Sequence, residues 1–278
     1  MSREIWLTHE TIYDFDRSVD GATVRARLRP IDDDAQTVLE SEVLCHPRPA
    51  ERSSRIAADG RTVERFVMAG PLRRIEIRGQ TRLSWTPDAA ALRASPPPRG
   101  DRPDRVPAWA RPDGTIWDWA SRALPDREPD ETQVAAFLDM LRAEFVFDPT
   151  ATEAATPVPR FFAARRGVCQ DYAGLAAGCL RARDVPVRLV FGYLIRDPDG
   201  GDRFEEGQPH AWLSYWTAAD GWRDADPTTG LVPPTHHLTL HRGMQLRDIQ
   251  PVAGKILSPD AVQRLSVRIT VVKDMSAS

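Results

Sequence analysis

Apolar and polar residues alternate along the first third of the chain, which is the pattern of strands that bury one face. The alternation is clearest in one long segment, in which these residues would share a face: Leu7, His9, Thr11, Tyr13 and Phe15. It recurs over residues 24–29 and 74–78, and Asp59-Gly60 between them signals a hairpin turn. These patterns predict an N-terminal β-rich, sandwich-like domain over residues 1–94.

The composition shifts to proline, aspartate and arginine after residue 94, beginning with Ser95-Pro96-Pro97-Pro98. Such a segment is typical of a linker or a long surface excursion. It also contains Trp109, Trp117 and Trp119, and three aromatic side chains would be costly to expose. Residues 95–130 are therefore expected to form a Pro-rich linker that is partly packed on the core.

Helical and strand periodicities are mixed over residues 131–278. Residues 132–147 and 171–183 carry apolar side chains at helical spacing. Residues 210–216 alternate, Asp220-Gly221 signals a turn, and residues 222–226 return as a partner strand that Pro227 ends. The last strand places four apolar residues on one face: Leu265, Val267, Ile269 and Val271. We expect an α+β fold in which a helix packs on an antiparallel sheet.

Cys169 lies at or just before the start of the second predicted helix, because Gly167 breaks the preceding segment. Unpaired backbone N–H groups and the positive end of the helix dipole favour a thiolate at this position. The same N–H groups could stabilise a tetrahedral oxyanion. Placement alone leaves a buried structural cysteine equally open.

His210 and Asp226 lie on the two strands of the predicted hairpin, which would bring them near each other. A lone histidine among aromatic residues is more often a packing residue than a catalyst. Cys, His and Asp in this order, however, are the ingredients of a thiol nucleophile, its base and the carboxylate that orients the base. Asp224 shares a face with Asp226, and we expect it to be solvated or paired with Arg223 or another basic group.

These segments resemble the core signature of the transglutaminase-like superfamily, in its bacterial cysteine-protease-like branch. The matching stretches are Arg166-Gly167-Val168-Cys169-Gln170-Asp171, then His210-Ala211-Trp212, then Gly221-Trp222 followed by Asp226-Pro227-Thr228. The resemblance implies a papain-like core with Cys169 as the nucleophile, His210 as the base and Asp226 as the orienting carboxylate.

The resemblance extends over most of the chain. Residues 7–13 and 28–30 resemble the family's β-rich N-terminal region, and residues 236–254 resemble the end of its core. Residues 95–129 match least. Gly174 is a departure, because relatives carry a larger residue there, and it puts local packing or substrate fit in doubt.

Composition agrees with an ordinary two-domain enzyme. The 278 residues carry a net charge of −3 with interleaved signs, so nothing calls for a nucleic-acid or membrane partner. No apolar run approaches a membrane span and no signal-peptide core follows the first residues, so a cytoplasmic location is expected. Three cysteines, Cys45, Cys169 and Cys179, are too few for a disulfide framework.

Two further polar clusters have a functional and a structural interpretation. His236, His237 and His241 could hold a metal, since His237 and His241 would share a strand face, but the spacing matches no standard ligand pattern and no metal is predicted. Arg165 and Arg166 could favour the thiolate or bind substrate carboxylates, and a solvated basic pair is an equal alternative.

The sequence thus predicts an enzyme that acts on a peptide or protein without a cofactor. Cys169 attacks an amide carbonyl, His210 protonates the leaving amine, and the thioester is resolved with His210 as general base. Hydrolysis of a peptide or isopeptide bond is the preferred reaction, because relatives of this branch look protease-like. Transfer to an amine is the alternative, and a non-catalytic scaffold role is the third reading, which the complete Cys-His-Asp set disfavours.

Overall fold

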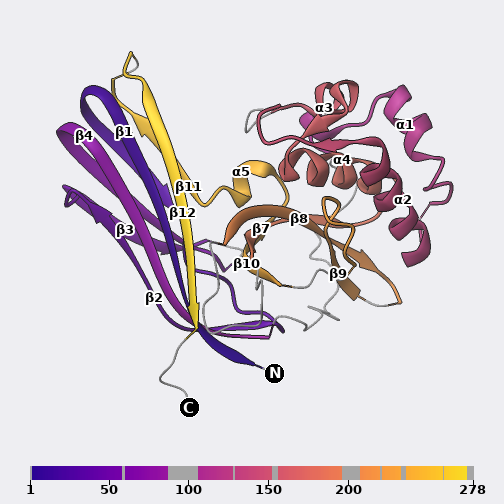
Figure 1. The fold of residues 1–278 in the computed structure, drawn as a ribbon, viewed down its shortest axis with the longest axis horizontal. Helices are drawn as coiled ribbons and strands as arrows, with labels where there is room; N and C mark the ends of the chain where they lie inside the picture. Colours follow the sequence, from indigo (N-terminus) through magenta and orange to yellow (C-terminus); the bar gives the residue numbers. More distant parts are fainter. Residues whose placement is uncertain are drawn as a thin grey trace.

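The computed structural model describes residues 2–57, 60–86, 106–127, 129–151, 156–195, 207–219, 221–232, 236–258 and 260–273. The described chain forms two lobes, one built of long strands and one in which helices cover a smaller sheet (Figure 1). The α+β class predicted from the sequence is confirmed. No helix in the described residues is long and apolar enough to cross a membrane.

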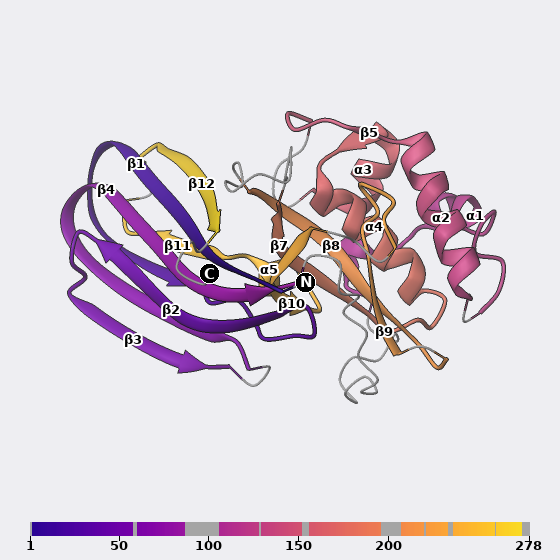
Figure 2. The same cartoon turned by 60° about the horizontal axis from the view of Figure 1, so that its bottom comes forward.

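The strand lobe is one antiparallel six-stranded sheet built around two long central strands, β1 (Arg3–Ala26) and β4 (Thr62–Trp85). Four shorter strands flank this pair: β2 (Gln36–His46) and β3 (Glu51–Ile56) beside β4, and β11 (Val252–Ile256) and β12 (Gln263–Lys273) beside β1. Register shifts between Asp14, Val19 and Gly21 interrupt the central pair. The sheet is accordingly strongly curved (Figure 2).

The face predicted from alternation is the buried one, since Leu7, His9 and Thr11 are each at most 2% exposed. The hairpin between β3 and β4 also forms, with Gly60 at a φ of 82°. Asp59 lies outside the described residues.

The last two strands of residues 131–278, the expected catalytic domain, lie outside the helical lobe. β11 and β12 return to the strand lobe and pair with opposite ends of β1 (Figure 1). Ile269 and Val271 of β12 are buried there, at 2% and 0% exposed. Alternation identified β12 as a strand, but periodicity carries no information about the partner strand, which here lies more than two hundred residues away in the sequence.

The second half of the expected linker packs on the helical lobe, whereas residues 87–105 lie outside the described part of the chain. It forms η1 (Ala108–Ala110) and α1 (Gly114–Ala120), whose N-cap Asp113 accepts from the backbone N–H of Ile116. The Trp119 ring packs edge-on against Phe137, Phe145 and Phe162, with centroids 5.4–5.6 Å apart. The described part of residues 95–130 therefore packs on the helical lobe through Trp119.

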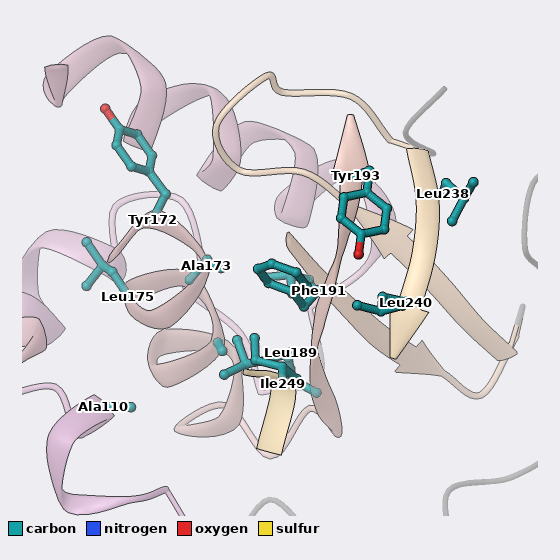
Figure 3. Packing of buried hydrophobic residues seen from close by; sticks show 14 of the residues in the cluster. Ala110, Tyr172, Ala173, Leu175, Leu189, Phe191, Tyr193, Leu238, Leu240 and Ile249 are labelled. Carbon is teal, nitrogen blue, oxygen red and sulfur yellow. The ribbon is translucent and has the colours of Figure 1, made fainter. Parts of the chain in front are cut away.

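The helical lobe contains a four-stranded antiparallel sheet in the order β10-β7-β8-β9. Its strands are β7 (Val187–Leu194), β8 (Gln208–Thr217), β9 (Gly221–Ala225) and β10 (His237–Gly243). The other elements are α2 (Glu131–Glu144), β5 (Val146–Phe147), α3 (Val158–Ala164), β6 (Arg166–Gly167), α4 (Cys169–Arg181) and α5 (Leu246–Ile249). Helix α4 packs on β7 and β8, and apolar side chains from α4, β7 and β10 gather in one cluster (Figure 3).

The helix expected over residues 132–147 ends earlier, at Glu144. Phe145 adopts an extended conformation, with φ −122° and ψ 151°, and Val146-Phe147 continue as β5 beside β6. The apolar run at the end of this segment therefore forms a short strand next to the cysteine segment, where tertiary pairing overrides helical periodicity.

Buried polar contacts join the two lobes along β10 and β7. Gln36 makes a pair of hydrogen bonds with the backbone of Thr239, at 2.7 and 2.9 Å. His9 lies 2.8 Å from the hydroxyl of Tyr193. Because unmade buried hydrogen bonds are costly, these contacts fix the position of β10 on the strand lobe.

Candidate active site

Cys169 is the first residue of α4, as the sequence predicts, and it is partly exposed. The residue two positions before Cys169 is glycine for a steric reason, because a Cβ on Gly167 would lie 2.5 Å from Oδ2 of Asp171 and 2.7 Å from the Phe161 ring. Oδ2 of Asp171 accepts from the backbone N–H of Val168 at 2.8 Å and so caps the helix. The first N–H groups of an α-helix lack the usual partner four residues back, so the start of α4 can stabilise a developing oxyanion next to Cys169.

His210 and Asp226 meet as the hairpin predicts. Nε2 of His210 lies 2.8 Å from Oδ2 of Asp226, and the two side chains are 8% and 0% exposed. Because an ionised carboxylate can only accept, Nε2 carries the proton of this bond. This tautomer leaves Nδ1 without a proton, and the side chain of Cys169 is close enough to His210 to influence its pKa. The structure thus brings all three predicted residues together.

The environment of His210 favours its protonated form. Burial by itself would lower the pKa of His210, but the hydrogen bonds to Asp226 and Cys169 and the charges of both groups raise it to about 10. A protonated imidazole next to the thiol is the partner that a thiolate needs and the acid that a leaving amine needs.

Asp226 is fixed by five hydrogen bonds. Oδ2 accepts from His210, from Nε2 of His237 at 3.0 Å and from Oγ1 of Thr229 at 2.8 Å. Oδ1 accepts from the backbone N–H groups of Thr228 at 2.8 Å and Thr229 at 3.4 Å. Burial would raise the pKa of Asp226, but the hydrogen bonds and the charges of the two histidines hold it far below its usual range. The carboxylate is therefore ionised wherever the protein is folded near neutral pH.

The indole ring of Trp212 packs against both His210 and His237. Its ring is stacked with His210 at a centroid distance of 6.2 Å and meets His237 edge to face at 4.9 Å. Space for the indole comes from Gly192 of β7, where a Cβ would lie 2.7 Å from Cη2 of Trp212 and 1.9 Å from the carbonyl oxygen of Leu238. A glycine at this position lets one side chain reach from β8 across β7 to β10.

Asp224 was expected to be either solvated or paired with a basic group. It is buried and ion-paired. Oδ2 of Asp224 accepts from the indole N–H of Trp212 at 3.2 Å and from Arg242 at 3.1 Å. The partner is therefore Arg242 rather than Arg223, which bonds Glu131. The two aspartates thus have different partners: Asp226 is hydrogen-bonded to the His210 imidazole, and Asp224 is hydrogen-bonded to the indole of Trp212 beside it.

The three clustered histidines have different surroundings. A register shift between Thr239 and His241 interrupts the pairing of β10 with β7. His237 reaches Asp226, while His241 is fully buried and stacked on Phe191 at 6.3 Å. In the described residues, the group whose spacing could accommodate a metal ion is His210, Asp226 and His237, with ligand atoms within 4.8 Å of one another. Hydrogen bonds to one shared oxygen account for that spacing.

The contact between His237 and Asp226 was not predicted from the sequence. The strand and the polarity of His237 were visible, but its contact with Asp226 depends on how the segment between them returns across the sheet, and the two residues are eleven apart.

Arg165 and Arg166 make ion pairs with acidic side chains near the site, and Arg165 also stacks on aromatic rings. The guanidinium of Arg165 stacks over Phe162 at 4.0 Å and Phe145 at 4.6 Å, and it pairs with Glu144 at 3.4 Å. Arg166 is 59% exposed and pairs with Asp148 at 3.5 Å. Gly174 has a similar structural explanation, because a Cβ there would lie 2.9 Å from the ring of Trp109.

The other two cysteines have the environments of unreactive thiols. Burial raises the pKa of Cys45 to about 11, although the charge of Arg52 acts in the opposite direction. Cys179 is completely buried, and its burial raises the pKa of the thiol further above the usual range. Cys169 is the one that combines exposure, a helix start and a histidine partner.

Comparison with known proteins identifies the class to which this fold and site belong. Residues 118–227 match the transglutaminase-like superfamily, and residues 5–84 match the bacterial transglutaminase-like N-terminal region. The chain therefore belongs to the transglutaminase-like superfamily, which confirms the resemblance found in the sequence.

Three relatives show how far the similarity extends. An uncharacterized protein of Mycobacterium tuberculosis (strain ATCC 25618 / H37Rv) is 27% identical over 294 residues, which cover 96% of this chain and 91% of that protein. A Pseudomonas aeruginosa protein named protein-glutamine gamma-glutamyltransferase is 33% identical over 150 residues, covering 50% of this chain but 22% of that protein. The crystal structure of a candidate cysteine protease from Cytophaga hutchinsonii aligns with a TM-score of 0.72 at 16% identity, covering 100% of this chain and 93% of that one, and shows the same fold.

Proposed function

We propose that this protein is a cysteine-nucleophile acyl-transfer enzyme that cleaves a peptide or isopeptide amide through a thioester on Cys169. One observation carries the proposal: the buried Asp226 carboxylate is hydrogen-bonded to His210, and His210 in turn interacts with the partly exposed thiol of Cys169 at a helix start. Each contact has a chemical purpose, because Asp226 fixes the tautomer, His210 holds the proton and the helix start stabilises negative charge.

The reaction follows from these contacts. The Cys169 thiolate adds to the carbonyl carbon of a peptide or protein amide, and the oxyanion lies at the N–H groups of the first turn of α4. The C–N bond then breaks as His210 transfers the proton on Nδ1 to the departing nitrogen, which leaves an acyl-thioester and a neutral imidazole. The imidazole takes a proton from water, the hydroxide oxygen attacks the thioester, and the acid and the free thiol are released.

Amine transfer is the second candidate, and the name of the Pseudomonas relative favours it. In that reaction a primary amine, instead of water, attacks the same thioester, and the first acyl donor would be a glutamine side chain. Both reactions use Cys169, His210 and Asp226 in the same roles, so they differ only in which nucleophile reaches the acyl group.

An acylation experiment tests the shared step independently of the natural substrate. The protein is mixed with p-nitrophenyl acetate, stopped with acid and analysed by peptide mass spectrometry, and we expect an acetyl group on Cys169. Cys169→Ala should carry no adduct in that peptide, and Cys169→Ser should acylate far more slowly. Acetylation of Cys45 alone, or of none of the cysteines in a folded protein, would refute the nucleophile.

A second arm of the experiment separates the two candidates. Glycine ethyl ester is added to the acetylated enzyme, and the products are quantified as free acetate or as the acetylated amine. The preferred reaction predicts that most of the product remains free acid. Predominant incorporation of the amine would replace hydrolysis by transfer and leave the nucleophile unchanged.

A further inference from the structure

Oδ2 of Asp226 is shared between two imidazole rings that come from β8 and β10, two strands of the sheet that are separated by β7. His210 reaches it from β8 at 2.8 Å, and His237 reaches it from the start of β10 at 3.0 Å. Both histidines are nearly buried, at 7% and 8% exposed. In the proposed reaction His210 transfers the protons, and His237 has no role yet.

The carboxylate determines which atom of His237 donates. An ionised Asp226 can only accept, so Nε2 of His237 carries a proton and donates it to Oδ2. The ring is held for this contact by Trp212, which it meets at 4.9 Å and 81°, and it lies 5.5 Å from the ring of His210. Trp212 is fixed in turn by its N–H bond to Asp224.

We propose that His237 is a positioning residue, which holds Oδ2 of Asp226 in the orientation that His210 needs and shares the negative charge on that oxygen. The proposal rests on the proposed function, because positioning matters only if His210 acts on Cys169. A hydrogen bond from a second donor keeps the carboxylate from rotating, and it also weakens the bond that the same oxygen can accept from His210.

Loss of His237 therefore has two consequences that oppose each other. The carboxylate is less firmly oriented, so acylation of Cys169 slows. At the same time, the whole charge of Oδ2 becomes available to His210, which stabilises its protonated form to a higher pH. The titratable groups around Asp226 are His210 and His237, and those around His210 are Asp226 and Cys169. A packing role for His237 would slow the reaction without this shift.

The test measures the rate of Cys169 acetylation by p-nitrophenyl acetate against pH, by mass spectrometry of the quenched protein. We expect His237→Phe to lower the rate about 10- to 100-fold, which is the size expected for a lost hydrogen bond to a charged group. In a plot of this rate against pH, the decrease on the alkaline side (the alkaline limb) should lie at higher pH in His237→Phe than in the wild type. His237→Gln keeps an amide N–H near Nε2 and should recover most of the rate and the wild-type limb.

Two further variants keep the test decisive. His237→Leu replaces His237→Phe if the larger ring prevents folding, as judged by the thermal unfolding midpoint. His241→Phe is the matched control, because His241 lies on the same strand, fully buried, and stacks on Phe191 away from Asp226. We expect it to leave the alkaline limb in place.

The outcomes separate the two proposals. If wild-type Cys169 is not acetylated, the proposed function fails. If wild-type Cys169 is acetylated but His237→Phe keeps the wild-type rate and limb, the positioning role alone is refuted. Equal losses in His237→Phe and His237→Gln with an unmoved limb would refute it as well and leave only packing.

Discussion

Asparagine in place of Asp226 changes one atom at the centre of the site. Backbone N–H groups of Thr228 and Thr229 point at Oδ1, so the asparagine oxygen takes that position and its amino group takes the position of Oδ2. Three donors face the amino group there, from His210, His237 and Thr229. The only way for His210 to accept from it is to move its proton to Nδ1, and Nδ1 is then unable to take a proton from the thiol.

The size of the loss follows from the tautomer. In other triads the same exchange of carboxylate for amide costs about 10⁴-fold in kcat, which corresponds to about 5 kcal/mol of transition-state stabilisation. We therefore expect Asp226→Asn to lose roughly 10³- to 10⁴-fold in the rate of Cys169 acylation. The assay is the pre-steady-state release of p-nitrophenol, with the acetyl adduct on Cys169 quantified in parallel.

Asp224→Asn is the matched control, because Asp224 lies two residues away and is also buried, at 6% exposed. The asparagine oxygen can still accept from Trp212, and Arg242 keeps its second partner, Asp33, at 3.0 Å. We expect a stability loss of about 1–2 kcal/mol and a decrease of roughly 2–6 °C in the unfolding midpoint, with acylation close to wild type. An inactive Asp224→Asn beside an active, folded Asp226→Asn would refute the assignment of the orienting carboxylate.

Three more outcomes follow from the same contacts. Gly192→Ala should destabilise the fold by about 1–3 kcal/mol in urea unfolding, because its Cβ would lie 2.7 Å from the Trp212 ring. Gly114→Ala should be neutral, because no atom lies within 4 Å of the new Cβ. Equal stabilities of the two variants would contradict the close packing at Gly192. The pKa of His210 is raised to about 10 in the folded protein, so its contribution to stability is complete below the unfolded value of about 6.5 and is lost as the pH rises to about 10. The difference in unfolding midpoint between wild type and His210→Gln should therefore shrink across that range, and a constant difference would argue against the raised pKa. Brief iodoacetamide treatment of Cys169→Ala should leave both Cys45 and Cys179 unlabelled in the folded protein, since burial holds both as thiols, and rapid labelling of either would count against that assignment.

Much of the site could be predicted from the sequence because its signals are local. Gly167, two residues before Cys169, avoids a side chain that would collide with Asp171 and Phe161, and the periodicity that follows predicts a helix that starts at the cysteine. The alternation around His210 and the turn before Trp222 place His210 and Asp226 on paired strands.

The remaining features depend on contacts between distant parts of the chain. Periodicity gave the strand character of β12 but not its pairing with β1. The register shift in β10 separates His237 from His241, although uninterrupted alternation would place them on one face. Asp224 is buried because Arg242 and Trp212, from two other strands, both donate hydrogen bonds to it. The residue pattern of one strand carries no information about such contacts.

Competitive alkylation of the three cysteines tests the central claim, that Cys169 is an activated nucleophile paired with His210. The folded protein is treated briefly with iodoacetamide at neutral pH, and peptide mapping gives the labelled fraction at Cys45, Cys169 and Cys179. We expect Cys169 to be alkylated far faster than the other two in the wild type, and its advantage to be lost in His210→Ala. Equal labelling of all three cysteines, or a Cys169 rate that does not depend on His210, would contradict the account.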